Sequence, residues 1–268
     1  MAMQRINGTT LWVEDTGPRS DAQPTILFSH GLLFSTALFA PQIAALRGQY
    51  RCVAYDHRGQ GQSAKSDLRS IDMELLYQDA VELVESLGVG PVHFVGLSMG
   101  GFVGMRMAAR RPDLVRSLAL LETSADGEPA ENWTKYRALS AAARVFGLAP
   151  VADRVMPILF AKSTLSDVSR AADVARWRAQ LIGNRRDIWR AVNGVIERNA
   201  IYPELKQIRC PTLVLVGDED VATVPAKSER LAAAIAGATL TRVPRAGHSS
   251  SLEAPEAVTA ALLTLLQR

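Results

Sequence analysis

The segment Gly96-Leu97-Ser98-Met99-Gly100 holds the residues whose types and spacing most directly indicate chemistry. It follows the apolar run Val92–Val95, which predicts a buried strand, and it opens a helical pattern over residues 99–110. A serine on such a sharp strand-to-helix turn has a strained backbone that exposes its hydroxyl above the sheet edge. The flanking glycines suit the turn, because neighbouring backbone comes too close for a Cβ atom. The pattern predicts a nucleophile at Ser98, against the alternative of a glycine-rich turn with an incidental serine.

A serine hydroxyl is a weak nucleophile at neutral pH, so it needs a base within reach and an acid that orients the base. The sequence offers four histidines, which are His30, His57, His93 and His248. Carboxylates follow two apolar runs that are expected to be strands: Glu122 follows the first, and Asp218, Glu219 and Asp220 follow the second. Functional groups of open parallel sheets gather at such carboxyl ends of strands. The residue types therefore supply a base and an acid and leave the choice among them open.

Five segments together resemble the α/β-hydrolase family: His30-Gly31, Asp56–Ser63, Gly96–Gly101, Gly217–Asp220 and Gly247-His248-Ser249. The resemblance covers nearly the whole chain and is strongest to bacterial esterases and lactonases, including 3-oxoadipate enol-lactonases and acyl-homoserine-lactone lactonases. It implies a mostly parallel central sheet flanked by helices, with an inserted helical lid. It also implies hydrolysis through an acyl-enzyme, with no metal and no organic cofactor. Haloalkane dehalogenases and epoxide hydrolases carry an aspartate at the nucleophile position, and Ser98 argues against both.

The resemblance assigns the base to His248. Members of the family carry the nucleophile, the acid and the histidine in that order along the chain. The other three histidines precede Ser98, whereas His248 follows the strand expected at residues 238–243. A loop histidine with surface hydrogen bonds is the alternative interpretation of this residue.

The resemblance assigns the acid to Asp220. In this family the acid is usually the fourth residue of a Gly-x-x-Asp turn, and Gly217 opens such a turn here. Asp218 and Glu219 are then expected to form the turn or to face solvent. Some relatives place the acid after the preceding strand, so Glu122 remains the alternative.

Two backbone N–H groups are expected to stabilise the negative charge that develops on a carbonyl oxygen during acyl transfer. The resemblance implies the N–H of Met99, which follows the nucleophile, and the N–H of Leu32 in the loop that begins at His30. His30 is expected to brace this loop, and Asp56–Gly61 is expected to support the floor of the site.

The elements that would hold these residues follow from the alternation of short apolar runs with longer helical patterns, which predicts βαβ units and a parallel sheet. Strands are expected at residues 25–29, 52–55, 92–95, 118–121, 212–217 and 238–243. Helices are expected at residues 36–47, 76–87, 99–110, 225–235 and from 255 onward. Gly88 should end the second helix in a left-handed conformation.

The alternation stops between residues 125 and 205, where helical patterns occur without a convincing strand. We therefore expect a core domain of residues 1–124 and 206–268 and a helical cap, or lid, of residues 125–205. Large side chains of this segment could line an apolar pocket over the nucleophile, although helical spacing more often marks packing; they are Trp133, Tyr136, Phe146, Met156, Phe160, Trp177 and Trp189. Three arginines could bind a substrate carboxylate or could form a solvated helix face, namely Arg185, Arg186 and Arg190.

The composition is that of a soluble globular protein: 268 residues, 48% hydrophobic and 21% charged. The net charge of +3 is scattered along the chain, which argues against a nucleic-acid partner. No apolar run has the length that spans a membrane, and the N-terminus lacks the pattern of a signal peptide, so we expect a cytoplasmic protein. Cys52 and Cys210 are expected to be buried free thiols. A homo-oligomer remains open.

The sequence as a whole predicts a serine hydrolase that cleaves a small, fairly apolar carboxylic ester or lactone. The same triad could instead cleave a carbon–carbon bond or perform perhydrolysis with peroxide. A ligand receptor that keeps the triad but turns over little is a third alternative. The expected lid sets the substrate, so the fold does not choose among these reactions.

Overall fold

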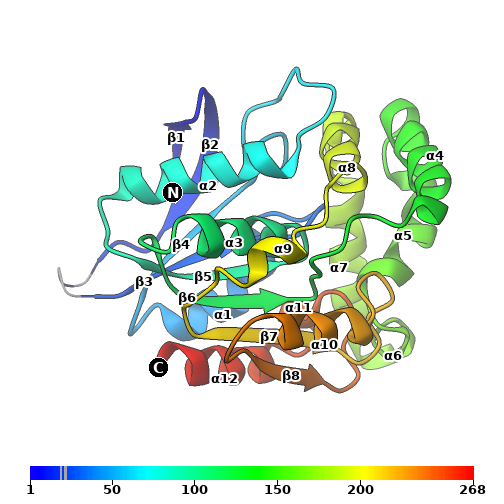
Figure 1. The fold of residues 1–268 in the computed structure, drawn as a ribbon. Coiled ribbons are helices and arrows are strands. Elements are labelled where there is room, and N and C mark those ends of the chain that lie inside the picture. The colour runs from blue at the N-terminus through cyan, green and yellow to red at the C-terminus, as the bar shows by residue number, and fades with distance from the viewer. Residues whose placement is uncertain (19, 21–22) are drawn as a thin grey trace.

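The computed structural model describes residues 1–18, 20 and 23–268, and these contain a central sheet of eight strands. The strands lie in the order β1-β2-β4-β3-β5-β6-β7-β8 across the sheet (Figure 1). Their bounds are β1 Ala2–Ile6, β2 Thr9–Asp15, β3 Thr25–Ser29, β4 Arg51–Tyr55, β5 Val92–Leu97, β6 Val115–Leu121, β7 Thr212–Gly217 and β8 Thr239–Val243. Strands β3 to β8 pair with one another in parallel. The pairs β1–β2 and β2–β4 are antiparallel. The predicted α/β-hydrolase fold, with its mostly parallel sheet, is confirmed.

Apolar side chains on both faces explain why the parallel strands read as continuous hydrophobic runs. Leu27, Phe94 and Val214 point to one face and pack with helices α2 (Met73–Leu87), α3 (Met99–Arg110) and α10 (Pro225–Ala234). Phe28 and Val95 belong to the opposite face, which α1 (Ala40–Leu46) and α12 (Pro255–Leu266) cover. Successive strand residues alternate between two buried layers, so the sheet is sealed on both sides.

The helix α2 has the ends that its sequence predicts. The carboxylate of Asp72 accepts a hydrogen bond of 2.8 Å from the N–H of Leu75 at the N-terminus. Gly88 follows the last turn with a φ of 61°, the left-handed conformation expected there. The helix expected at residues 36–47 is instead divided into a 3-10 turn, Thr36–Phe39, and α1.

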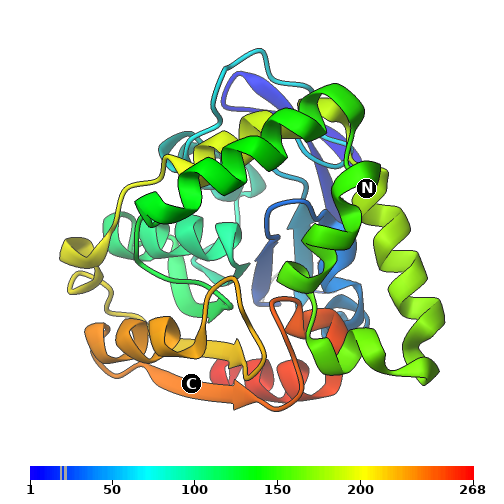
Figure 2. The same cartoon turned by 90° about the vertical axis from the view of Figure 1, so that its right-hand side faces the viewer.

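The segment between β6 and β7 is helical in the part that the structure describes, and no strand interrupts it. Its helices are α4 Ala130–Phe146, α5 Ala152–Leu159, α6 Lys162–Ser166, α7 Ala171–Ile182, α8 Trp189–Ile196 and α9 Tyr202–Leu205. Helices α4, α5, α7 and α8 lie on the side toward which the arrow of β6 points (Figure 1). The view from that side shows them in front of the sheet edge (Figure 2). Among the described residues, no helix combines the length and apolarity that a membrane crossing requires.

Candidate active site

Ser98 lies between the last residue of β5 and the first residue of α3, with φ 52° and ψ −110°. This left-handed backbone is unusual for a serine, and it is held by a hydrogen bond of 2.8 Å from the Ser98 N–H to the carbonyl of Leu121. A Cβ atom on Gly96 would collide with the backbone of Gly100, and one on Gly100 would collide with the carbonyl of Ser29. The glycines therefore permit the tight turn that the sequence predicts.

His248 and Asp220 form a hydrogen-bonded pair. The Nδ1 atom of His248 lies 2.9 Å from Oδ2 of Asp220, and both side chains are buried. The carboxylate also accepts hydrogen bonds from the Thr223 hydroxyl (2.7 Å) and from the N–H groups of Ala222 and Thr223 (2.8 and 3.0 Å). Burial alone would raise the pKa of Asp220, but the imidazole and the Thr223 donors hold this pKa below its usual value. Asp220 is thus ionised and fixes the orientation of the ring.

Ser98 and His248 line the same cavity, which has a volume of about 160 Å³. Its walls combine Leu32 and Leu33, from the loop after β3, with aliphatic side chains of the inserted helices, among them Leu139, Ala143, Leu148, Val151, Val155, Val192 and Ile196. A dry aliphatic cavity of roughly 150 Å³ can hold a benzene-sized molecule. The structure therefore brings the predicted nucleophile and base together at the wall of a small apolar cavity.

Glu122, the alternative acid, has a different environment. It is fully buried at φ 43°, and its carboxylate lies near the Ser250 hydroxyl and the Gly217 backbone without a well-formed hydrogen bond among the described residues. Burial raises the pKa of Glu122 well above its usual value, and the nearby carboxylates of Asp220 and Glu253 add to this shift. This environment favours the neutral form of the Glu122 carboxyl group.

The Glu122→Gln variant is expected to gain stability relative to the wild type as the pH rises. Between the ordinary glutamate pKa and the raised pKa in the folded protein, the folded state binds more protons than the unfolded chain. The stability contributed by Glu122 is therefore complete at acidic pH and decreases as the pH rises, by up to about 1.4 kcal/mol per pH unit. Urea unfolding of both proteins between about pH 5 and 8 measures the difference. A difference that did not change with pH, or that reversed in sign, would refute the neutral carboxyl; the exposed Glu256→Gln variant is the control.

The two expected oxyanion donors come from two segments that adjoin Ser98 or its cavity. Met99 is the first residue of α3, so its N–H has no acceptor within the helix, and Leu32 lines the cavity with Ser98. Gln60 connects the two segments: its Oε1 accepts a hydrogen bond of 3.1 Å from the Leu33 N–H, and its Nε2 lies 3.6 Å from the sulfur of Met99. Sequence reasoning placed Gln60 only in the supporting floor and missed this bridge.

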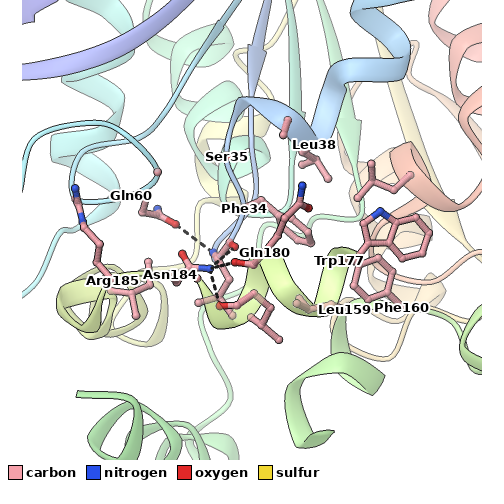
Figure 3. Close-up of a pocket in the computed structure, with 18 residues that line it drawn as sticks. Phe34, Ser35, Leu38, Gln60, Leu159, Phe160, Trp177, Gln180, Asn184 and Arg185 are labelled. Carbon is pink, nitrogen blue, oxygen red and sulfur yellow. Dashed lines mark hydrogen bonds between the residues drawn. The ribbon is translucent and has the colours of Figure 1, made fainter. Parts of the chain in front are cut away.

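Leu33 adopts a left-handed backbone, with φ 70°, beside the expected donor Leu32. Its N–H is held by Gln60, and its carbonyl accepts a hydrogen bond of 3.0 Å from Asn184 in the inserted segment (Figure 3). These contacts keep the backbone in a conformation that costs a non-glycine residue roughly 1–3 kcal/mol.

The Gln60→Leu variant is expected to lower kcat about ten-fold and to change KM little. The substitution releases the Leu33 N–H without removing either oxyanion donor, so the loss should be smaller than the 10²–10³-fold cost of deleting a donor. Steady-state kinetics on an aryl ester measures both constants, with the exposed Gln62→Ala variant of the same loop as the control. An unchanged kcat would show that the bridge does not position the oxyanion donors.

The floor of the site is a buried polar network. His57 Nε2 lies 3.0 Å from the Ser29 hydroxyl, and the His57 N–H donates to His30 Nε2 at 3.0 Å. His30 Nδ1 in turn lies 2.7 Å from the carbonyl of Gly31. Burial lowers the pKa of both imidazoles, so they are neutral in the folded protein. His30 thus braces the loop that carries Leu32, as expected.

Glu253, which the sequence did not single out, ties the inserted segment to the loop around His248. Its carboxylate accepts hydrogen bonds from the N–H groups of Ala161 (2.7 Å), Gly247 (2.9 Å) and Ser249 (3.2 Å). These three backbone groups come from segments about 90 residues apart in the chain, so no local pattern could indicate the contact.

A second cavity of about 200 Å³ adjoins the first and shares Leu33 and Leu159 with it. Figure 3 shows Phe160 and Trp177 stacked at one end, with ring centroids 4.7 Å apart, and Arg185 near Gln60 at the other end. Two of the three candidate arginines donate to backbone carbonyls: Arg185, which lines this second cavity, donates to Ser63 at 2.7 Å, and Arg190 donates to residues 67 and 68. Of the aromatic residues expected over the nucleophile, Tyr136 lines the Ser98 cavity, whereas Phe146 is exposed.

No group of three or more His, Cys, Asp or Glu side chains with the arrangement of a metal site occurs among the described residues. Cys52 is buried and Cys210 is partly buried, and both are free thiols.

This fold and this arrangement of residues define a class of protein. A model of the alpha/beta hydrolase family matches residues 26–261, so the chain belongs to this family and is a hydrolase. The matched range includes Ser98, Asp220 and His248 and the strands that precede them. The resemblance inferred from the sequence is confirmed.

Individual relatives place the chain within the family. It is 31% identical over 255 residues to a Caulobacter sp. (strain K31) protein provisionally named carbamate hydrolase RutD, covering 93% of this chain and 92% of the relative. It is 26% identical over 246 residues to 3-oxoadipate enol-lactonase 2 of Acinetobacter baylyi, covering 92% and 90%. The crystal structure of the enol-lactonase from Burkholderia xenovorans LB400 superposes with a TM-score of 0.91 at 30% identity over 100% of both chains.

Proposed function

We propose that the chain is a serine hydrolase that cleaves a small, fairly apolar carboxylic ester or lactone through an acyl-enzyme intermediate. The observation that carries the proposal is that His248, paired with Asp220 at 2.9 Å, lines the same cavity as a serine on a left-handed turn. These three groups have the types and the order of a nucleophile, a base and an orienting acid.

In the proposed reaction the Ser98 hydroxyl attacks the carbonyl carbon while Nε2 of His248 removes its proton. Asp220 holds Nδ1 of the ring, so that Nε2 is free to accept this proton, and stabilises the imidazolium that forms. The N–H groups of Leu32 and Met99 donate to the oxyanion. His248 then protonates the leaving alcohol, and the same ring activates a water molecule that hydrolyses the acyl-enzyme.

The substrate class follows from the cavity and from the relatives. Aliphatic side chains form most of its lining, which favours a small apolar acyl group or ring beside the serine. Two relatives bear the name enol-lactonase, which supports a lactone among the substrates. The name of the Caulobacter relative supports a carbamate as a further compound to test, since the same serine could attack its carbonyl.

We also propose that residues 125–205 act as a cap on a core of residues 1–124 and 206–268. Helices α4, α5 and α8 contribute cavity-lining residues, and the core contributes others from α3 and from the segments that follow β3, β5, β7 and β8. The bound substrate would then touch both parts, with the cap selecting the acyl group. The partner in this reaction is a small molecule, and the proposal needs neither nucleic acid nor membrane.

A panel of substrates tests the proposal. It contains aryl esters and lactones of graded size, a carbamate, a vinylogous diketone for carbon–carbon cleavage, and peroxide with acetate for perhydrolysis. Turnover of esters or lactones above the others is the expected result. Preferred turnover of the diketone or peroxide would assign the triad to another reaction. Rapid labelling of Ser98 by a fluorophosphonate without turnover of any compound would favour a receptor.

A further inference from the structure

One end of the Ser98 cavity is polar, although most of its lining is aliphatic. Glu128, Tyr136 and Arg198 line the cavity together with Ser98. Nη1 of Arg198 lies 2.9 Å from Oε2 of Glu128, and both side chains are at least nine-tenths buried. Tyr136 lines the same end of the cavity as this pair. Burial and the Glu128 carboxylate raise the pKa of Tyr136, and Arg198 partly offsets this shift.

Two donors at this end have no partner in the described part of the chain. Arg198 uses Nε for the carbonyl of Asp126 (3.1 Å) and Nη1 for Glu128 and the carbonyl of Val195 (2.7 Å), which leaves Nη2 without a hydrogen bond. The Tyr136 hydroxyl also lacks a hydrogen bond. Both atoms remain accessible, because neither is among the enclosed polar atoms without a partner. Two unused donors at one wall of the cavity are therefore available to an acceptor on a bound molecule.

The charges at this end are balanced. The guanidinium of Arg198 is neutralised by the Glu128 carboxylate in direct contact, and the Asp220 carboxylate lies beside His248. A substrate carboxylate entering this cavity would lose its hydration without meeting an uncompensated positive charge. A neutral carbonyl or hydroxyl oxygen would accept from Nη2 and from the Tyr136 hydroxyl without that cost.

The position of Phe102 indicates the distance between the polar end of the cavity and Ser98. The guanidinium carbon of Arg198 is 4.5 Å from the Phe102 ring centroid. Phe102 lies one helical turn beyond Ser98, with its N–H bonded to the Ser98 carbonyl at 3.1 Å. One turn rises about 5.4 Å, so the Arg198 guanidinium lies on the order of one to two turns from Ser98.

We propose that Arg198 and Tyr136 select substrates whose apolar acyl part carries a neutral oxygen acceptor, a ketone or hydroxyl, several carbons from the carbonyl that Ser98 attacks. This inference rests on the proposed ester or lactone hydrolysis and specifies its substrate class. Glu128 holds Arg198 in place, and the aliphatic walls accommodate the intervening carbons.

Three 4-nitrophenyl esters test the proposal in the wild type: the heptanoate, the 6-oxoheptanoate and the mono-ester of adipate. The kcat/KM of the oxo ester should exceed that of the heptanoate by roughly ten-fold, the effect of one hydrogen bond to a charged donor. The adipate ester, with its free carboxylate, should be the poorest. Equal rates for the oxo ester and the heptanoate, or a preference for the carboxylate, would overturn the proposal.

Two variants assign the preference to these side chains. Tyr136→Phe removes a hydroxyl that has no protein partner among the described residues, and it should reduce the ratio of oxo ester to heptanoate several-fold. Arg198→Lys keeps the charge beside Glu128 but loses the second donor arm, and it should also reduce the ratio. The control is Arg137→Met, an exposed position of the same helix as Tyr136, which should retain the wild-type ratio. An unchanged ratio in Tyr136→Phe and Arg198→Lys would refute the assignment.

Binding to the Ser98→Ala variant separates this inference from the proposed function. Calorimetric titration with the heptanoate and the oxo ester needs no turnover. Tighter binding of the oxo ester, lost in the Ser98→Ala/Tyr136→Phe double variant, supports the acceptor site even if the wild type hydrolyses no ester. Hydrolysis of all three esters with equal binding would retain the proposed function and reject the acceptor site.

Discussion

The Ser98→Ala variant is expected to lose at least about 10⁴-fold in kcat on any ester that the wild type hydrolyses. The substitution removes the oxygen that forms the acyl-enzyme, and the remaining oxyanion donors and cavity give only weak catalysis by comparison. Steady-state kinetics, with fluorophosphonate labelling followed by mass spectrometry, measures the loss of turnover and of the covalent adduct.

The fold should survive this substitution. The bond from the Ser98 N–H to the Leu121 carbonyl uses backbone only, and alanine adds no atom to the turn. The matched control is Ser124→Ala, which removes a buried hydroxyl that has no hydrogen bond to a described residue. Both variants should unfold near the wild-type temperature, and the control should keep its activity. Turnover near the wild-type rate in a folded Ser98→Ala protein would disprove the assignment of the nucleophile.

The Asp220→Asn variant is expected to lower kcat by about 10⁴-fold, because an amide favours the wrong tautomer of the histidine and cannot stabilise its charged form. Asp220 accepts from His248, from Thr223 and from two backbone N–H groups, so the variant also loses acceptor capacity in a buried place. Rates should be compared at several pH values, with unfolding measured in parallel.

The Glu122→Gln variant provides the comparison that decides between the two acids. Burial favours the neutral form of Glu122, and its carboxyl oxygens make no hydrogen bond to the imidazole, so its amide should retain most of the activity. A loss in Glu122→Gln greater than that in Asp220→Asn would transfer the role of the acid to Glu122.

The inner strands could be predicted because they are buried on both faces and read as short apolar runs. Thr25–Ser29 and Thr212–Gly217 have the predicted bounds. The hairpin of β1 and β2 was not predicted, because β1 is an edge strand whose residues are mostly exposed and carry no continuous apolar pattern.

The site divides in the same way between local and distant signals. The turn at Ser98 is encoded by adjacent glycines, so five residues indicate it. The choice of His248 and Asp220 needed the order in which family members carry the nucleophile, the acid and the histidine along the chain. Spacing alone does not bring residues 98, 220 and 248 together. Gln60, Glu253 and Arg198 act through contacts between segments far apart in the chain, which only the folded structure shows.

The most direct test of the central claim is mass spectrometry of the enzyme stopped during turnover of a slowly deacylating aryl ester. If Ser98 is the nucleophile, the protein gains the mass of one acyl group, and the adduct lies on the peptide containing Ser98. A burst of one nitrophenol per active site should precede the steady rate. Turnover with no acyl adduct, or an adduct on another residue, would contradict this assignment.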